Sequence, residues 1–229
     1  LVGIPACFAG VMADDIIVEV DGESTTGWTV HDAVRHITGP ADTAVEIGLR
    51  REGEDDLVNV SIVRDVIKMP TVQGWRKLGI DDRGREDWNW FVDEDDGVGY
   101  IKLTGFQLRK SSNEVREALV DLNTRGMKRL IFDLRGNSGG YLHEAVRITD
   151  LMLPKDRLVV YTAGRAFPDT SWYHTENPAL LDTDAPLIVV VDQGSASASE
   201  IVAGAIQDWD RGLVIGMPPV GKGSVQQTW

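Results

Sequence analysis

Cysteine and histidine, the side chains that most often build disulfide frameworks and zinc sites, are scarce in this sequence. Its 229 residues contain one cysteine, Cys7, and four histidines. A single cysteine excludes an internal disulfide and cannot by itself supply a thiolate metal site. We therefore expect Cys7 to be a small apolar residue of the core.

Basic residues are also in the minority. Lysine and arginine total 23 against 36 aspartates and glutamates, which gives a formal charge of −13 at pH 7. The acidic residues are scattered along the whole chain, and no basic patch interrupts them. Because such a chain repels phosphate groups, the composition disfavours a nucleic acid as partner.

Long apolar runs are missing as well. The strongest, PLIVVV at residues 186–191, has the size of a buried strand and is too short to cross a bilayer. We therefore expect no membrane-spanning segment in this sequence. The composition, 42% hydrophobic and 26% charged, is typical of a globular protein with one large domain or two modest ones.

The residue patterns that are present divide the chain into parts. Residues 1–65 predict a small β-rich module, with strands at 15–20 and 43–50 and a helix at 30–37. Residues 66–98 are polar, which indicates a connector with edge strands.

From residue 99 to residue 229 strands alternate with helices. The expected strands are 100–103, 130–134, 158–161, 187–191 and 213–215, and the expected helices are 113–125, 142–153 and 198–209. The stretch 169–176, which contains His174, is polar and predicts a loop. Alternation of this kind predicts an α/β layer around a mainly parallel sheet.

Three of these strands run into loops of small residues. The loops are RGNSGG at 135–140, GSASASE at 194–200 and GMPPVGKGS at 216–224. Because the carboxyl ends of parallel strands meet at one edge of the sheet, we expect the three loops to lie together.

The loop at 194–200 is the most informative because a helix begins in it. A nucleophile at the amino end of a helix has backbone N–H groups beside it. Ser195, Ser197 and Ser199 are the candidates, although a serine directly before Glu200, such as Ser199, is also typical of a plain helix N-cap.

The other two loops could supply the remaining parts of a catalytic site. The glycines at 136–140 allow a tight turn whose N–H groups point at a developing oxyanion, or an ordinary turn. Lys222 lies between two glycines. A lysine acts as a base only where burial lowers its pKa from about 10.4, and otherwise it is a solvated surface residue.

Together these motifs resemble the carboxyl-terminal processing peptidases, also called tail-specific proteases. The resemblance covers nearly the whole chain and is weakest over 66–97. Its core motifs are GYIKL at 99–103, DLRGNSGG at 133–140, GSASASEIVAGA at 194–205 with QD at 207–208, and GKGSVQ at 221–226. In the first module, PA at 5–6, AG at 9–10, DI at 15–16, VDG at 20–22 and AV at 33–34 are similar to the PDZ domain that such enzymes carry, with Asp14 where glycine is usual.

The resemblance implies a role for particular residues. By it, the nucleophile is Ser197, the general base is Lys222, and Gln226 orients the lysine. The oxyanion hole would combine the N–H of Ala198 with that of Gly139 or Gly140. The implied reaction needs no metal and no cofactor, and the implied core is an α/β layer of the crotonase and ClpP kind.

The resemblance also implies a substrate and a location. The substrate would be a protein or peptide with a free carboxyl-terminal tail, in the bacterial periplasm or cell envelope. In the PDZ-like module, the tail would lie in a groove flanked by the helix residues Val30, Ala33, Val34 and Ile37. The PDZ loop that binds the carboxylate would lie before Leu1, and further strands that cover the site would follow Trp229.

Three alternatives compete with this interpretation. A P-loop matches Gly216 to Lys222 but lacks the following serine or threonine and the helix that binds phosphate. A histidine-based serine hydrolase would have to use His143 or His174, since His31 and His36 fall in the first module. A PDZ scaffold with an inactive site is the alternative that is not an enzyme.

Overall fold

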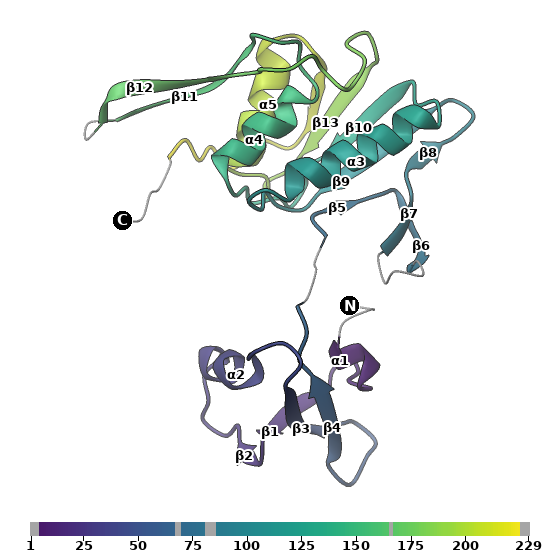
Figure 1. Ribbon diagram of the computed structural model, residues 1–229, viewed down its shortest axis with the longest axis vertical. Helices are drawn as coiled ribbons and strands as arrows, with labels where there is room; N and C mark the ends of the chain where they lie inside the picture. The colour runs from purple at the N-terminus through teal and green to yellow at the C-terminus, as the bar shows by residue number, and fades with distance from the viewer. Residues whose placement is uncertain (1–4, 67–69, 81–85, 165–166, 225–229) are drawn as a thin grey trace. The chain divides into compact units, whose positions relative to one another are not determined.

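The structure, a computed structural model, describes residues 5–66, 70–80, 86–164 and 167–224. The chain divides into two compact units, one formed by residues 1–69 with 80–85 and the other by residues 70–79 with 86–229. The first unit is rich in strands and the second combines strands and helices, so the predicted fold class is confirmed (Figure 1). No helix among the described residues is long and apolar enough to span a membrane.

The first unit contains a four-stranded antiparallel sheet in the order β2-β1-β3-β4. Alternation places Val45, Ile47 and Leu49 of β3 and the facing residues of β4 in one apolar core. The elements are α1 (Pro5–Phe8), β1 (Ile16–Val20), β2 (Glu23–Ser24), α2 (Val30–Ile37), β3 (Ala44–Arg50) and β4 (Val58–Val63).

The helix predicted at 30–37 is confirmed as α2, and its start has a clear local cause. The Asp32 N–H donates to the Thr29 hydroxyl (3.2 Å), and the Thr29 N–H donates to the Asp32 carboxylate (3.0 Å). This reciprocal capping satisfies two of the amides that a helix start leaves unpaired.

Cys7 and Asp14, near the start of the first unit, differ from the expected burial and from the expected residue type. Cys7 is exposed, so its prediction as a core residue is wrong. It lies on the four-residue helix α1, which turns Ala6 toward the core and the next residue away from it. Asp14 has φ +69, a left-handed conformation that glycine adopts without strain, which explains why glycine is usual at this position.

The second unit contains a six-stranded sheet in which β14, β13, β10 and β9 are parallel neighbours and the edge strands β5 and β8 pair antiparallel with β9. Its strands are β5 (Val72–Gln73), β8 (Phe91–Asp93), β9 (Val98–Leu103), β10 (Arg129–Asp133), β13 (Leu187–Val191) and β14 (Leu213–Gly216). The mainly parallel sheet is therefore confirmed.

In the described part of the second unit, three helices cover this sheet. They are α3 (Ser111–Thr124), α4 (Leu142–Asp150) and α5 (Ala198–Asp208). α3 packs on α4 and α4 on α5, and their apolar residues share one core with β9, β10 and β13 (Figure 1). α4 ends at Asp150, three residues before the predicted end, because the chain turns at Leu151 ahead of Pro154.

Among the described ranges, two strand pairs lie outside this sheet. β6 (Arg76–Ile80) pairs with β7 (Glu86–Asn89), and β11 (Leu158–Gly164) pairs with β12 (Phe167–His174). The prediction of a loop at 169–176 is therefore wrong over most of its length. The pairing with β11 supplies the hydrogen bonds that turn this polar stretch into a strand, and the hairpin projects from the layered core (Figure 1).

A partly buried ion pair in the first unit gives a test of its acid stability. The Asp15 side chain is 1% exposed and accepts hydrogen bonds from Arg51 Nε (2.8 Å), Arg51 Nη2 (2.7 Å) and the Met12 N–H (2.8 Å). The bonds from Arg51 and then from the Met12 amide lower the pKa of Asp15 to about 2.

Because the folded state holds the charged form of Asp15, this stabilisation is present above about pH 4, where the unfolded residue ionises, and is lost as the pH falls toward 2. We expect Asp15→Asn to lower the urea midpoint of the first unit at neutral pH and to flatten its decline below pH 4. Urea unfolding across that range measures both effects. Asp14→Asn, on the exposed neighbour, should leave the profile unchanged, and an equal decline in Asp15→Asn would contradict the assignment.

Candidate active site

The three loops predicted to lie together follow β10, β13 and β14, which are adjacent parallel strands. Hydrogen bonds join them. The Gly136 N–H donates to the Asp192 carboxylate (2.8 Å), and the Val220 N–H donates to the Ser195 carbonyl (3.1 Å). The carboxyl edge of the sheet therefore brings the three loops together, as the parallel arrangement predicts.

Two of the three candidate serines hold the loops in place. Ser195 and Ser199 are fully buried. The Ser195 hydroxyl donates to the Leu134 carbonyl (2.8 Å), and the Ser199 hydroxyl donates to the Asn137 carbonyl (2.8 Å). Both hydroxyls are thus bonded to backbone carbonyls in or directly before the loop at 135–140, and neither is placed to attack a substrate.

Ser197 differs from both neighbours. It is partly exposed and is itself the N-cap residue of α5, so the alternative that Ser199 is the N-cap is wrong. The Glu200 carboxylate accepts the Ser197 N–H (2.6 Å), and this bond fixes the start of the helix three residues before Glu200.

The backbone at Ser197 is strained. Its φ of 56° and ψ of −112° lie in a region that residues other than glycine rarely adopt. Such a conformation costs on the order of 1–3 kcal/mol and persists only where the surroundings impose it, typically at functional sites. The sharp turn between β13 and α5 is therefore maintained by the bonds on either side of Ser197.

The glycine pair packs directly against this turn. A Cβ on Gly139 would lie 2.7 Å from the Ala196 carbonyl oxygen and 2.9 Å from the Ser197 Cβ, and a Cβ on Gly140 would lie 2.3 Å from the Phe106 carbonyl oxygen. Both residues also have positive φ, 100° and 146°. No other residue type fits either position without displacement.

The backbone N–H groups of the glycine pair are not equivalent. The Gly139 N–H donates to Asn137 Oδ1 (2.9 Å). Within the described ranges, the N–H groups of Gly140 and Ala198 have no protein acceptor. Each of these two amides could therefore donate to a further acceptor without the loss of an existing bond.

Asn137 and Asp192 were missed by the sequence reasoning, and both organise the loops. Asn137 is fully buried, donates through Nδ2 to the Leu103 carbonyl (2.9 Å) and accepts at its own carbonyl from the Ala196 N–H (3.0 Å). The Asp192 carboxylate accepts the N–H groups of Gly136 and Gly194. The bond from Gly136 contributes most to a pKa of Asp192 below its ordinary value.

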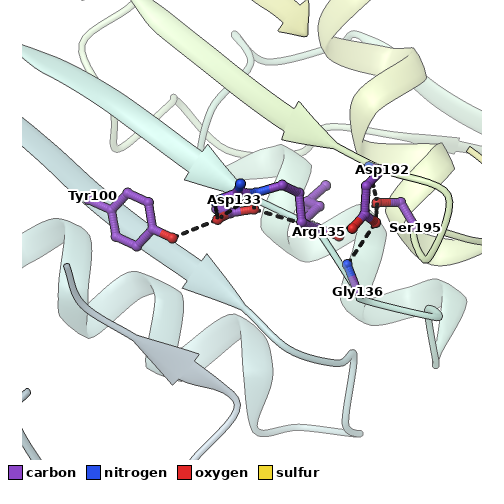
Figure 2. Close-up of polar contacts among 7 residues, drawn as sticks. Tyr100, Asp133, Arg135, Gly136, Asp192 and Ser195 are labelled. Carbon is purple, nitrogen blue, oxygen red and sulfur yellow. Dashed lines mark hydrogen bonds and ion pairs between the residues drawn. The ribbon is translucent and has the colours of Figure 1, made fainter. Parts of the chain in front are cut away.

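A buried acid anchors the end of β10. Figure 2 shows the Asp133 carboxylate between Tyr100, whose hydroxyl donates to it (2.6 Å), and Arg135, whose Nη2 donates to it (2.7 Å). Burial alone would raise the pKa of Asp133, but these bonds outweigh it and the pKa is lowered. Burial, followed by the bond to Asp133, raises the pKa of Tyr100 to about 12.

Lys222 lies in the third loop and is exposed. Its N–H and that of Gly221 donate to the Glu200 carboxylate, at 2.9 Å and 2.6 Å. Residues 222–224 form no helix, so the phosphate-binding helix of a P-loop is missing from this described stretch. Gln226 lies outside the described residues.

His143 and His174 are the histidines that an imidazole base would have to come from. His143 is in the first turn of α4, where its ring contacts Tyr173 (centroids 5.6 Å apart), and His174 ends β12. His36 stacks on Trp28 in the first unit. Among the described residues, no histidine is hydrogen-bonded to Ser197, which disfavours an imidazole base.

The four residues proposed to flank a peptide groove lie on α2 of the first unit. Val30 and Val34 are 83% and 51% exposed and are one helical turn apart, so they form an apolar stripe open to solvent. Ala33 is partly buried, and Ile37 packs on the core of this unit.

The contrast among the three serines can be measured. We expect Ser195→Ala and Ser199→Ala each to lower the free energy of unfolding by about 0.5–1.5 kcal/mol, because each removes a buried hydroxyl donor from a carbonyl that then keeps only its backbone N–H donor. Ser197→Ala removes a partly exposed hydroxyl and should change stability by less than about 0.5 kcal/mol. Urea unfolding of the three variants beside the parent chain tests this order, and a large loss for Ser197→Ala alone would contradict it.

Known proteins are similar to this chain. The model of "Peptidase family S41" matches residues 97–229, and that of a "PDZ domain" matches residues 2–51. Over 97% of its length the chain is 37% identical to a carboxy-terminal-processing protease of Bartonella bacilliformis. Over 99% of its length it is 34% identical to carboxyl-terminal-processing peptidase 2, chloroplastic, of Arabidopsis thaliana.

The chain spans about half the length of these curated relatives, 47% and 41% respectively. The solved structure of a photosystem II D1 C-terminal processing protease aligns with 97% of this chain and 56% of that one, with a TM-score of 0.56 and 27% identity. The family match over 97–229 confirms the resemblance drawn from the motifs: this chain belongs to peptidase family S41 and carries a PDZ domain in its first unit.

Proposed function

We propose that this chain is the peptidase portion of a serine endopeptidase that cleaves proteins near their carboxyl-terminal ends, with Ser197 as nucleophile and Lys222 as general base. One observation carries the proposal. Of three neighbouring serines, Ser197 alone is partly exposed, and it is held in a strained turn at the amino end of α5 beside two glycines. A nucleophile needs that combination of access and adjacent backbone amides.

The proposed reaction is acyl transfer followed by hydrolysis. The Ser197 hydroxyl attacks the peptide carbonyl carbon while the neutral Lys222 amine takes its proton. The C–N bond then breaks, Lys222 returns the proton to the leaving amine, and the acyl group remains on Ser197 as an ester. Water activated by Lys222 hydrolyses that ester. Gln226, by resemblance to the family, orients the lysine, and no metal or cofactor takes part.

We assign the oxyanion hole to the N–H groups of Ala198 and Gly140. The sequence left Gly139 and Gly140 as alternatives. The Gly139 amide already donates to Asn137 Oδ1, whereas the amides of Gly140 and Ala198 have no acceptor in the described part of the chain. Preorganised donors of this kind stabilise the charge that develops on the carbonyl oxygen.

A lysine base has to be shielded from water to be neutral near pH 7. Lys222 is exposed here. We propose that the substrate polypeptide, laid across the carboxyl edge of the sheet, supplies this cover, so that the base is completed only when a substrate is bound.

The proposed substrates are proteins with free carboxyl-terminal tails, which the PDZ domain would capture along α2 beside Val30 and Val34. PDZ domains bind such tails as an added strand. The names of the relatives support this class of substrate, since they describe carboxyl-terminal processing. By the same resemblance we propose the bacterial periplasm or cell envelope as the location.

The base is the part of the mechanism that a single substitution tests best. Arginine keeps the charge of lysine but cannot lose its proton, so Lys222→Arg should reduce peptide cleavage by about 100-fold or more. Ser197→Ala should be equally inactive, and His143→Ala and His174→Ala should retain activity. Cleavage of a tail peptide and labelling of Ser197 by a fluorophosphonate measure these effects. Full activity in a folded Lys222→Arg variant would refute the lysine base, and absence of any cleavage of tail peptides by the folded parent chain would favour an inactive scaffold.

Tail capture by the first unit is tested by binding to the full-length protein, so that the carboxylate-binding loop expected before Leu1 is present. A peptide with an apolar tail and a free carboxylate should bind about tenfold or more tightly than its amidated form, since the carboxylate is a charged hydrogen-bond acceptor. Val34→Asp should weaken binding of the free acid, whereas Arg35→Asp, on the next exposed position of α2, should not. Calorimetric titration gives both affinities, and equal binding of the two peptides would remove the idea of carboxylate capture.

A further inference from the structure

Glu200 binds more than the first turn of helix α5. Its carboxylate accepts three backbone hydrogen bonds, from the N–H groups of Ser197 (2.6 Å), Gly221 (2.6 Å) and Lys222 (2.9 Å). The first donor is the amide of the proposed nucleophile, and the last is the amide of the proposed base. One side chain therefore joins the backbones of the two residues that must meet for catalysis.

The geometry of the third loop suits this carboxylate. Gly221 has φ +79, and its N–H and the next one along the chain converge on the same acid group. Successive amides that converge in this way form a concave site for an anion. A carboxylate has about four acceptor positions, so it can receive all three donors, whereas a neutral amide side chain cannot.

The other attachments of this loop lie nearer its start and involve backbone atoms alone. The Met217 N–H donates to the Val191 carbonyl (3.2 Å), and the Val220 N–H donates to the Ser195 carbonyl (3.1 Å). Over residues 217–224, the part of the loop that the structure describes, Glu200 is the side chain that holds the segment at the lysine itself.

We propose that Glu200 is a positioning residue that fixes the separation of Ser197 and Lys222 by binding both backbones to one carboxylate. This inference rests on the proposed function of the two residues. Glu200 acts through Lys222 rather than on the substrate. Its loss should therefore lower kcat and leave KM nearly unchanged.

Glu200→Gln is the direct test, because it replaces one carboxylate oxygen by an NH2 group that faces N–H donors. We expect hydrogen exchange at Gly221 and Lys222 to become about tenfold faster or more, and kcat to fall about tenfold or more with KM within about twofold. Glu200→Asp keeps the charge on a shorter side chain and should be intermediate in both measurements. If Glu200→Gln does not fold, Glu200→Asp carries the test by the same two measurements.

Glu117→Gln, the same substitution on an exposed position of α3, is the matched control and should change neither exchange nor kcat. Unchanged exchange in Glu200→Gln would overturn the attachment of the loop, and faster exchange with unchanged kcat would overturn the positioning role. Failure of the proposed function itself would be recognised separately, by full activity in Lys222→Arg.

Discussion

The hydrogen bonds that join the loop after β10 to the loop after β13 are the constraint on which the whole site depends. The carbonyls of Leu134 and Asn137 accept the hydroxyls of Ser195 and Ser199, and the Asp192 carboxylate accepts the Gly136 N–H. Each loop begins at the end of a parallel strand, so the sheet fixes where both loops start. Buried donors and acceptors are costly to leave unpaired, and this cost keeps the two loops together.

This network also explains how a strained residue persists at Ser197. Its neighbours on both sides, Ser195 and Ser199, are buried and bonded, and its own N–H is held by Glu200. The turn between them can close only if Ser197 adopts its unusual φ and ψ, and Gly139 leaves room for it. The strain is thus offset by bonds made elsewhere, which is typical of residues held ready for a reaction.

A buried carboxylate near the same loops is stabilised by hydrogen bonds in a similar way. Asp133 is fully buried, yet it stays ionised because Arg135 and Tyr100 donate to it. A buried carboxylate without such partners would be strongly destabilising. The same bonds hold Arg135 at the start of the loop at 135–140. Asp133 and Arg135 therefore connect the interior of the sheet to the edge where the loops meet (Figure 2).

The sequence by itself determined the elements whose periodicity is local, such as α2 and β13, and the meeting of the three loops, since parallel strands impose it. It did not predict β12, because a polar stretch becomes a strand only when β11 lies beside it. From the residues alone three serines were candidates, and the family resemblance named Ser197. Tertiary structure decided which hydroxyls bond to the backbone, because Ser195 and Ser199 find their acceptors 61 and 62 residues earlier in the chain, and only folding brings those carbonyls within reach.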